Sequence, residues 1–188
     1  MIVNGVTEAS PRFFELSPER RWPASLAAAA LAIASLVHFG LGARGVISAG
    51  LVCCLCVLAA IDLECRMIPN RIVLPATGII LVAQIAFFGD FALEWIACGL
   101  GAALVLFLPT LFRADAIGMG DVKLGLLLGV GLGVDVVRAL LLGSLAAVPA
   151  ALWILATRGM AARSETIPLG PFLALGGVLA LFLGDLPS

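Results

Sequence analysis

Long apolar runs separated by short polar stretches make up most of this chain. A helix needs about 20 predominantly apolar residues to cross the ~30 Å hydrocarbon core of a bilayer. Most of the runs approach that length, so the pattern predicts helices that cross a membrane several times. The predicted helical runs are residues 24–41, 46–61, 72–88, 92–112, 122–133, 139–156 and 169–183.

The run 122–133 is the one whose length does not fit a full crossing. At 1.5 Å per residue a helix of this length reaches about 18 Å, well short of the hydrocarbon core. Asp135 and Arg138 follow it and interrupt the apolar pattern. The fold class predicted is therefore an all-α, polytopic membrane helix bundle of six to seven transmembrane helices.

The distribution of basic residues favours seven spans with a cytoplasmic N-terminus, because Lys and Arg gather in cytoplasmic loops. Seven spans leave only Arg44 and Arg138 outside, and six spans leave three basic residues outside. Both arrangements place the polar stretches after the second run and before the fifth on the cytoplasmic side. The basic residues that seven spans place inside are Arg12, Arg20, Arg21, Arg66, Arg71, Arg113, Lys123, Arg158 and Arg163.

Composition supports a membrane protein and narrows its partners. Of 188 residues, 62% are hydrophobic and 12% charged, whereas soluble domains are roughly 45–50% apolar and about 25% charged. The lipid bilayer is thus a predicted partner, and the net charge of −1 argues against nucleic acid. We divide the chain into a polar, cytoplasmic N-terminal segment, residues 1–23, and a single transmembrane domain, residues 24–186.

The cysteines do not predict a metal site. Cys53 and Cys56 form a C-x-x-C pair inside the second run, but a structural zinc site usually needs four ligands. The sequence has no second pair, and His38 is its only histidine. We interpret these cysteines as small apolar residues of a helix and predict neither a metal nor a cofactor.

Two polar stretches stand out because ionisable residues at the edge of hydrocarbon are costly. The first, residues 62–71, begins with Asp62 directly after the second run. The second is Gly118-Met119-Gly120-Asp121-Val122-Lys123, directly before the short fifth run. Both acids then lie at helix ends on one membrane face, and we predict that the helices bring Asp62 and Asp121 together. Gly118 and Gly120 would let the backbone approach a substrate or a neighbouring helix closely.

A pair of carboxylates in one site has a specific chemistry. The two cannot both ionise cheaply, so the pair is expected to hold one proton and to titrate as a unit. One carboxylate can then act as general base on a water while the other protonates the substrate. This is the chemistry of an aspartic protease, which requires no metal.

Structural explanations exist for each acid taken singly. Asp121 is placed to cap a helix starting at Val122, and Asp62 can pair with Arg66, four residues later. The side chain of Lys123 can act on a nearby acid or bind a lipid headgroup. Two other acids compete with the pair: Glu64, which lies about 200° around a helix from Asp62 and should face away from it, and Asp115 in the loop.

At three places the chain resembles the type IV prepilin peptidase family. The stretch from Gly118 to Lys123 resembles that family's G-x-G-D-x-K motif. Asp62 followed by Ile68-Pro69-Asn70 resembles its first aspartate motif, D-x-x-x-x-x-[IL]-P-[ND]. The stretch Ile167-Pro168-Leu169-Gly170-Pro171-Phe172-Leu173-Ala174 resembles its C-terminal motif I-P-F-G-P-F-L-A.

The resemblance implies an intramembrane aspartyl endopeptidase. Such enzymes remove the short, positively charged leader from prepilins and pseudopilins at the cytoplasmic face of the inner membrane. Asp62 and Asp121 would be the catalytic pair, without a cofactor. The residues of the three motifs that would shape or border the active site are Gly118, Gly120, Lys123, Pro69, Asn70, Pro168, Gly170 and Pro171.

Longer members of the family carry an N-terminal cytoplasmic domain with two C-x-x-C pairs and also N-methylate the new terminus. Only residues 1–23 precede the first run of this chain. It therefore resembles the short, peptidase-only branch found with tight-adherence (Flp-type) pili or archaeal preflagellins, and N-methyltransferase activity is not expected. The expected partners are a prepilin or pseudopilin substrate and the pilus assembly machinery.

Two other kinds of protein fit part of the pattern. A non-catalytic membrane subunit of a pilus or secretion assembly could keep the fold, although such a subunit does not need both aspartates. A proton-coupled carrier could use two acids as a relay, but that predicts acids near the bilayer midplane rather than at span ends. Neutralising one aspartate separates these alternatives from a peptidase.

Overall fold

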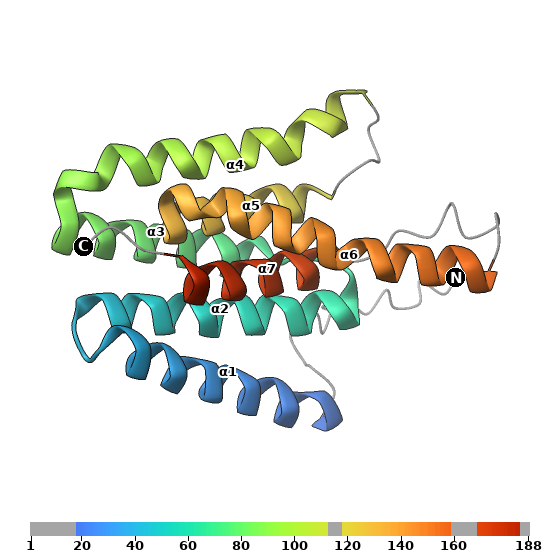
Figure 1. Ribbon diagram of the computed structural model, residues 1–188, viewed down its shortest axis with the longest axis horizontal. Coiled ribbons are helices and arrows are strands. Elements are labelled where there is room, and N and C mark those ends of the chain that lie inside the picture. Colours follow the sequence, from blue (N-terminus) through green and yellow to red (C-terminus); the bar gives the residue numbers. More distant parts are fainter. Residues whose placement is uncertain (1–17, 113–117, 159–168, 185–188) are drawn as a thin grey trace, which may run out of the picture.

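A computed structural model describes residues 18–112, 118–158 and 169–184 of the chain, and in these residues every regular element is helical (Figure 1). Each of the predicted runs corresponds to one α-helix, with ends that differ by at most six residues, and the all-α class is confirmed. The helices are α1 Pro18–Phe39, α2 Ala43–Cys65, α3 Asn70–Phe88, α4 Ala92–Phe112, α5 Met119–Leu132, α6 Val136–Arg158 and α7 Gly170–Leu183, with 3₁₀ turns η1 Gly89–Phe91 and η2 Gly133–Asp135.

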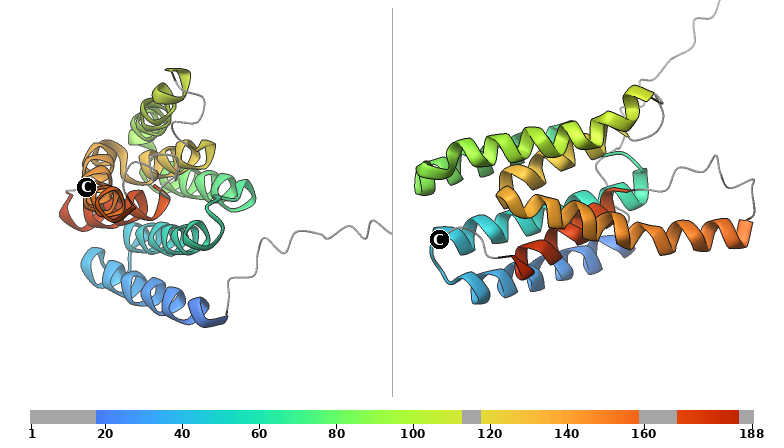
Figure 2. Two further views of the ribbon diagram at one scale, coloured as in Figure 1. Left: turned by 90° about the vertical axis from the view of Figure 1, so that its right-hand side faces the viewer. Right: turned by 45° about the horizontal axis from the view of Figure 1, so that its top comes forward.

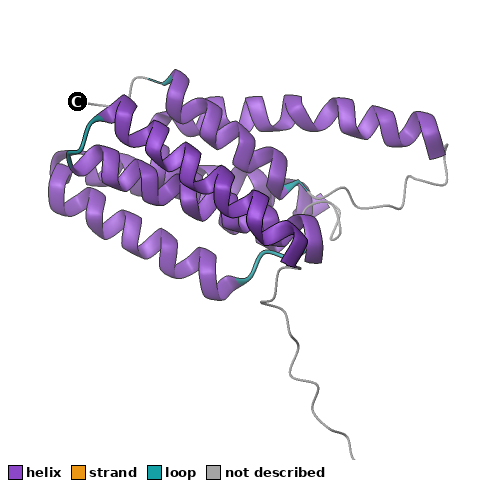
Figure 3. Cartoon of the chain, turned by 90° about the horizontal axis from the view of Figure 1, so that it is seen from below, coloured by secondary structure: helices purple, strands orange, loops and turns teal. Residues whose placement is uncertain are grey.

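The helices run alternately in opposite directions along the bundle. As a result the C-terminal end of α2 and the N-terminal ends of α3, α5 and α7 all lie towards the same end, on the right of Figure 1. Within the described residues, short loops join the helices at the two ends of the bundle (Figure 3). This arrangement carries the residues after α2 and those before α5 to one place.

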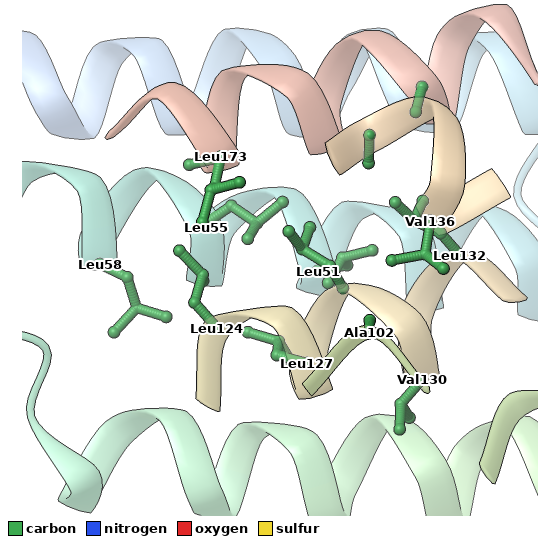
Figure 4. Close-up of a cluster of buried hydrophobic side chains, with 14 of the residues drawn as sticks. Leu51, Leu55, Leu58, Ala102, Leu124, Leu127, Val130, Leu132, Val136 and Leu173 are labelled. Carbon is green, nitrogen blue, oxygen red and sulfur yellow. The ribbon is translucent and has the colours of Figure 1, made fainter. Parts of the chain in front are cut away.

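The short helix α5 lies in the middle of the bundle, where it contacts α3, α4, α6 and α7 (Figure 2). From Leu124 to Leu132 it is apolar on all sides, as expected of a helix segment buried all round. Leu124, Leu127 and Leu128 are at most 1% exposed and belong to one hydrophobic cluster, to which α2, α3, α4, α6 and α7 also contribute (Figure 4). This burial fixes the position of the first turn of α5, which carries Asp121.

Glycines allow α4 and α5 to pack backbone against backbone. A Cβ atom on Gly129 would lie 2.5 Å from the Cα of Gly99, and one on Gly125 would lie 2.6 Å from Leu106 Cδ1. Small residues at such positions are the usual means by which membrane helices approach closely. The glycines of the fifth run therefore have a packing role.

In the part of the chain that the structure describes, four helical stretches are long and apolar enough to cross a membrane: Trp22–Phe39, Ala43–Cys65, Asn70–Phe112 and Met119–Trp153. The last two each contain two α-helices joined by a 3₁₀ turn. Gly170–Leu183 is a shorter apolar helix, and α5 is about 21 Å long at 1.5 Å per residue. The number of membrane crossings, six or seven, therefore stays a prediction from the sequence.

Large apolar side chains cover the outside of the bundle, for example Val37, Leu41 and Phe112, each at least 80% exposed. A surface of this kind suits lipid rather than water. Most of the predicted N-terminal segment, residues 1–23, lies outside the described residues. The division into that segment and a single domain over 24–186 stays a prediction as well.

Candidate active site

The two polar stretches meet at one end of the bundle and line a single cavity of about 310 Å³. Asp62 comes from the last turn of α2 and Asp121 from the first turn of α5. The structure thus brings the two aspartates together, although 58 residues of the chain separate them. The cavity is lined by Asp62, Arg66, Met67, Ile68, Asn70, Gly118, Met119, Gly120, Asp121 and Lys123.

Asp62 is 5% exposed, and its Oδ2 atom has no hydrogen-bond partner among the described residues. The first residue of α7 covers this carboxylate, since a Cβ atom on Gly170 would lie 2.5 Å from Asp62 Oδ2 and 3.1 Å from its Cγ. Burying a polar group without a partner is costly, so an unpartnered group of this kind calls for an explanation other than stability.

The pairing of Asp62 with Arg66 is not found. The backbone amide of Arg66 donates a hydrogen bond to the backbone carbonyl of Asp62 over 2.8 Å, but the two side chains, both in the described part of the chain, form no ion pair. The expectation of a simple interfacial ion pair was therefore wrong. The geometry at the end of α2 explains this, because Arg66 leaves the helix in the left-handed conformation.

Asp121 is not the capping residue of the fifth helix, contrary to the structural alternative drawn from the sequence. The helix begins at Met119 rather than Val122, and Gly118 occupies the N-cap position in an extended conformation. The amide of Asp121 donates to the carbonyl of Gly118 over 3.0 Å. Its side chain lines the cavity, close enough to Asp62 for their like charges to interact.

The two glycines of the second stretch differ in their surroundings. A Cβ atom on Gly120 would lie 2.9 Å from Ile68 Cβ, so this glycine is what lets the start of α5 approach the loop after α2. A Cβ atom on Gly118 would meet Asp121 Oδ2 at 3.5 Å, which is an ordinary van der Waals distance. Close approach is required at Gly120 and not at Gly118.

The side chain of Lys123 bonds to Asn70 of the first aspartate motif. The partners considered from the sequence were a nearby acid or a lipid headgroup. The Nζ atom of Lys123 donates to Asn70 Oδ1 over 2.6 Å. Asn70 begins α3, and Pro69 before it is the N-cap residue, whose carbonyl accepts the amides of Ile72 and Val73. Lys123 therefore links the first turns of α3 and α5.

The third motif reaches the site through α7. Gly170 contacts the Asp62 carboxylate, and Pro171 follows it in the first turn of the helix. Pro168 lies outside the described residues, as does Asp115, one of the competing acids. Glu64, the other competitor, does not line the cavity.

Ile68 and Arg66 line the cavity but were not among the residues predicted to border the site, although Ile68 belongs to the first aspartate motif. Ile68 is 9% exposed and lies against both Gly120 and Gly170, so it joins all three motifs. An apolar residue in a polar stretch between two helices was the available signal. Arg66 lines the cavity from a left-handed backbone conformation, with φ 51°, for which the sequence offers no signal.

The fold and the cavity define an all-helical membrane protein with two carboxylates gathered at one end of its bundle. The profile of the type IV leader peptidase family matches residues 49–155, more than half of the chain, and the chain belongs to that family. The matched region contains both aspartates.

Curated relatives carry the name prepilin leader peptidase/N-methyltransferase. The chain is 36% identical over 168 residues to such a protein of Burkholderia pseudomallei strain K96243, covering 85% of this chain and 53% of the relative. It is 30% identical over 170 residues to that of Bacillus subtilis strain 168, covering 86% and 65%. The chain thus spans between about half and two thirds of their length. No solved structure matches it.

Proposed function

We propose that this protein is an intramembrane aspartyl endopeptidase that removes the leader peptide of type IV prepilins or prepilin-like proteins. Asp62 and Asp121 are its catalytic pair. The observation that carries the proposal is the buried Asp62 carboxylate, with one unpartnered oxygen, in the same cavity as Asp121. Family membership and the names of the relatives support the choice of substrate.

The reaction follows from two carboxyl groups that share one proton. The ionised one removes a proton from a water, whose oxygen bonds to the scissile carbonyl carbon, while the protonated one gives its proton to the carbonyl oxygen. The group that took the water proton then protonates the leaving amide nitrogen as the C–N bond breaks. The other recovers a proton from the diol, so the pair ends as it began.

The glycines and the position of the cavity suit a peptide substrate. Gly120 and Gly170 bring three segments close around the aspartates, leaving room at the end of the bundle for a short peptide. The basic residues Arg66, Arg71 and Lys123 lie at this end, because Arg66 follows α2 and the other two are near the starts of α3 and α5. By the positive-inside rule this end, and with it the N-terminus, is cytoplasmic in a multi-pass protein of the inner membrane.

The names of the relatives also include N-methyltransferase. A pair of carboxylates supplies the chemistry for hydrolysis, and the proposal is limited to the peptidase reaction. Assembly with pilus machinery is part of the same proposal and rests on the family alone.

Processing of a prepilin in cells tests the proposal. We would co-express the full chain with prepilins from the same genome and follow the leader by gel shift and N-terminal sequencing. Wild type, Asp62→Asn and Asp121→Asn are compared at matched membrane levels. Asp90→Asn, in the exposed turn η1, is the control because Asp90 does not line the cavity.

Cleavage by wild type and the control, and by neither of the site variants, is the expected result. Cleavage by both site variants would show that the aspartates are not the catalytic pair. If processing of prepilins in the cell proceeds equally with and without the protein, the alternative of a non-catalytic membrane subunit gains instead.

A further inference from the structure

The residue that ends α2 has an unusual backbone conformation. Arg66 has φ 51° and ψ 34°, and it is the only residue other than glycine with positive φ among the described residues. The position that follows a helix in the left-handed region is most often occupied by Gly, because a Cβ atom is unfavourable there. A residue kept in such a conformation at a site points to a functional reason.

The position of the Arg66 side chain points to that function. This side chain is exposed and lines the cavity that contains Asp62 and Asp121. Among the described residues its guanidinium makes no hydrogen bond and no ion pair, whereas the neighbouring cation Lys123 is bonded to Asn70. The cavity thus contains a planar group of five donors that is not used by the described fold.

The backbone conformation couples this group to the acid. The amide of Arg66 donates to the carbonyl of Asp62 over 2.8 Å at the end of α2, whose last residue is Cys65. The turn therefore sets the direction of the Arg66 side chain relative to the residue that bears the buried carboxylate.

We infer that Arg66 is a substrate-binding residue that donates hydrogen bonds to a backbone carbonyl oxygen of the peptide lying in the cavity. A guanidinium has donors and no acceptor, so its ligand must supply an acceptor oxygen. An anionic side chain would meet the charge of Asp62 and Asp121, whereas a neutral carbonyl would not. This inference rests on the proposed peptidase function.

Substitution by glycine separates binding from stability, because the two effects have opposite signs. Arg66→Gly is expected to raise the thermal unfolding temperature, since glycine adopts the left-handed conformation without strain. It is expected to raise KM for a full-length prepilin about tenfold or more, since hydrogen bonds from a charged group are lost, with a smaller effect on kcat. Arg71→Gly is the matched control, being an exposed arginine in the first turn of α3 that does not line the cavity.

The control should lower the unfolding temperature and leave KM unchanged. Arg66→Gln and Arg66→Met test the ligand and do not depend on the glycine variant folding. With a carbonyl ligand, the glutamine amide retains part of the binding and Met retains none. All variants are measured on the purified full chain in lipid vesicles, with Asp62→Asn alongside.

A KM that stays at the wild-type value in Arg66→Gly, Arg66→Gln and Arg66→Met, while Asp62→Asn is inactive, overturns the role of Arg66 and leaves the peptidase proposal standing. If the effect of Arg66→Met disappears when the acidic residues of the prepilin are replaced by their amides, the ligand is a carboxylate and the inference is wrong. Cleavage by Asp62→Asn overturns the proposed function and this inference together.

Discussion

The ammonium group of Lys123 in α5 donates a hydrogen bond to the side-chain oxygen of Asn70 in α3 over 2.6 Å, across 53 positions of the sequence. Lys123 lies two residues after Asp121, and Asn70 ends the stretch that begins with Asp62. The bond therefore ties the two aspartate motifs together at the cavity wall. We therefore expect both polar residues to have a positioning role in the proposed site.

Removing this bond from either side should impair cleavage by a similar amount. Lys123→Met and Asn70→Leu are each expected to lower kcat about 3- to 10-fold, since a hydrogen bond near the surface contributes about 1 kcal/mol. The double variant should be no worse than either single one, because each single variant has already lost the shared bond and the two effects are therefore not additive. Lys123→Arg keeps a donor and is the control, and losses that multiply in the double variant would contradict the shared role.

Gly170→Ala should slow cleavage roughly 100-fold without preventing folding. The added Cβ atom would lie 2.5 Å from Asp62 Oδ2, so the carboxylate must move. Displacing a reacting group by about 1 Å can cost roughly 100-fold in rate. Gly101→Ala is the control, because nothing lies within 4 Å of a Cβ atom there. Single-turnover cleavage rates in vesicles measure the effect, and a rate equal to that of the control would contradict the contact.

Alanine at the two glycines of the second motif should give unequal results. Gly120→Ala places a Cβ atom 2.9 Å from Ile68 Cβ and forces α5 away from the loop after α2. Gly118→Ala meets only Asp121 Oδ2, at 3.5 Å, and its φ of −66° and ψ of 140° are open to any residue. We expect a loss of at least about tenfold in kcat/KM for the first, from a shift of a few tenths of an ångström or more in the site. The second should stay within a few-fold of wild type, and equal losses would argue for a shared role of both glycines.

Gly129→Ala should destabilise the protein through the packing of α4 on α5. The new Cβ atom would lie 2.5 Å from Gly99 Cα, a backbone atom that cannot rotate away. Overpacking of this kind costs typically about 1–3 kcal/mol in the free energy of unfolding. Gly50→Ala, where no atom lies within 4 Å, should instead stabilise α2 by roughly 0.5–1 kcal/mol. Thermal unfolding of both variants in the same detergent gives the comparison.

The pattern of apolar and polar residues was enough to predict the number and positions of the helices in the described residues. Helix formation in an apolar run is a local matter, because backbone groups in hydrocarbon must bond within their own segment. The family could be recognised from the sequence for a similar reason, because Asp62, Asp121 and the residues beside them form short local motifs. The helix ends were less certain, and α5 begins at Met119 rather than Val122.

How the residues of different helices meet could not be predicted from the sequence and was seen only in the folded bundle. The tertiary structure placed α5 in the middle of the bundle, bonded Lys123 to Asn70, distinguished Gly120 from Gly118 and covered the Asp62 carboxylate with Gly170. These are contacts between residues far apart in the chain, and they depend on how whole helices pack rather than on any one stretch of residues. The backbone conformation of Arg66 also could not be predicted from the sequence, since a non-glycine residue adopts positive φ only where its surroundings hold it there.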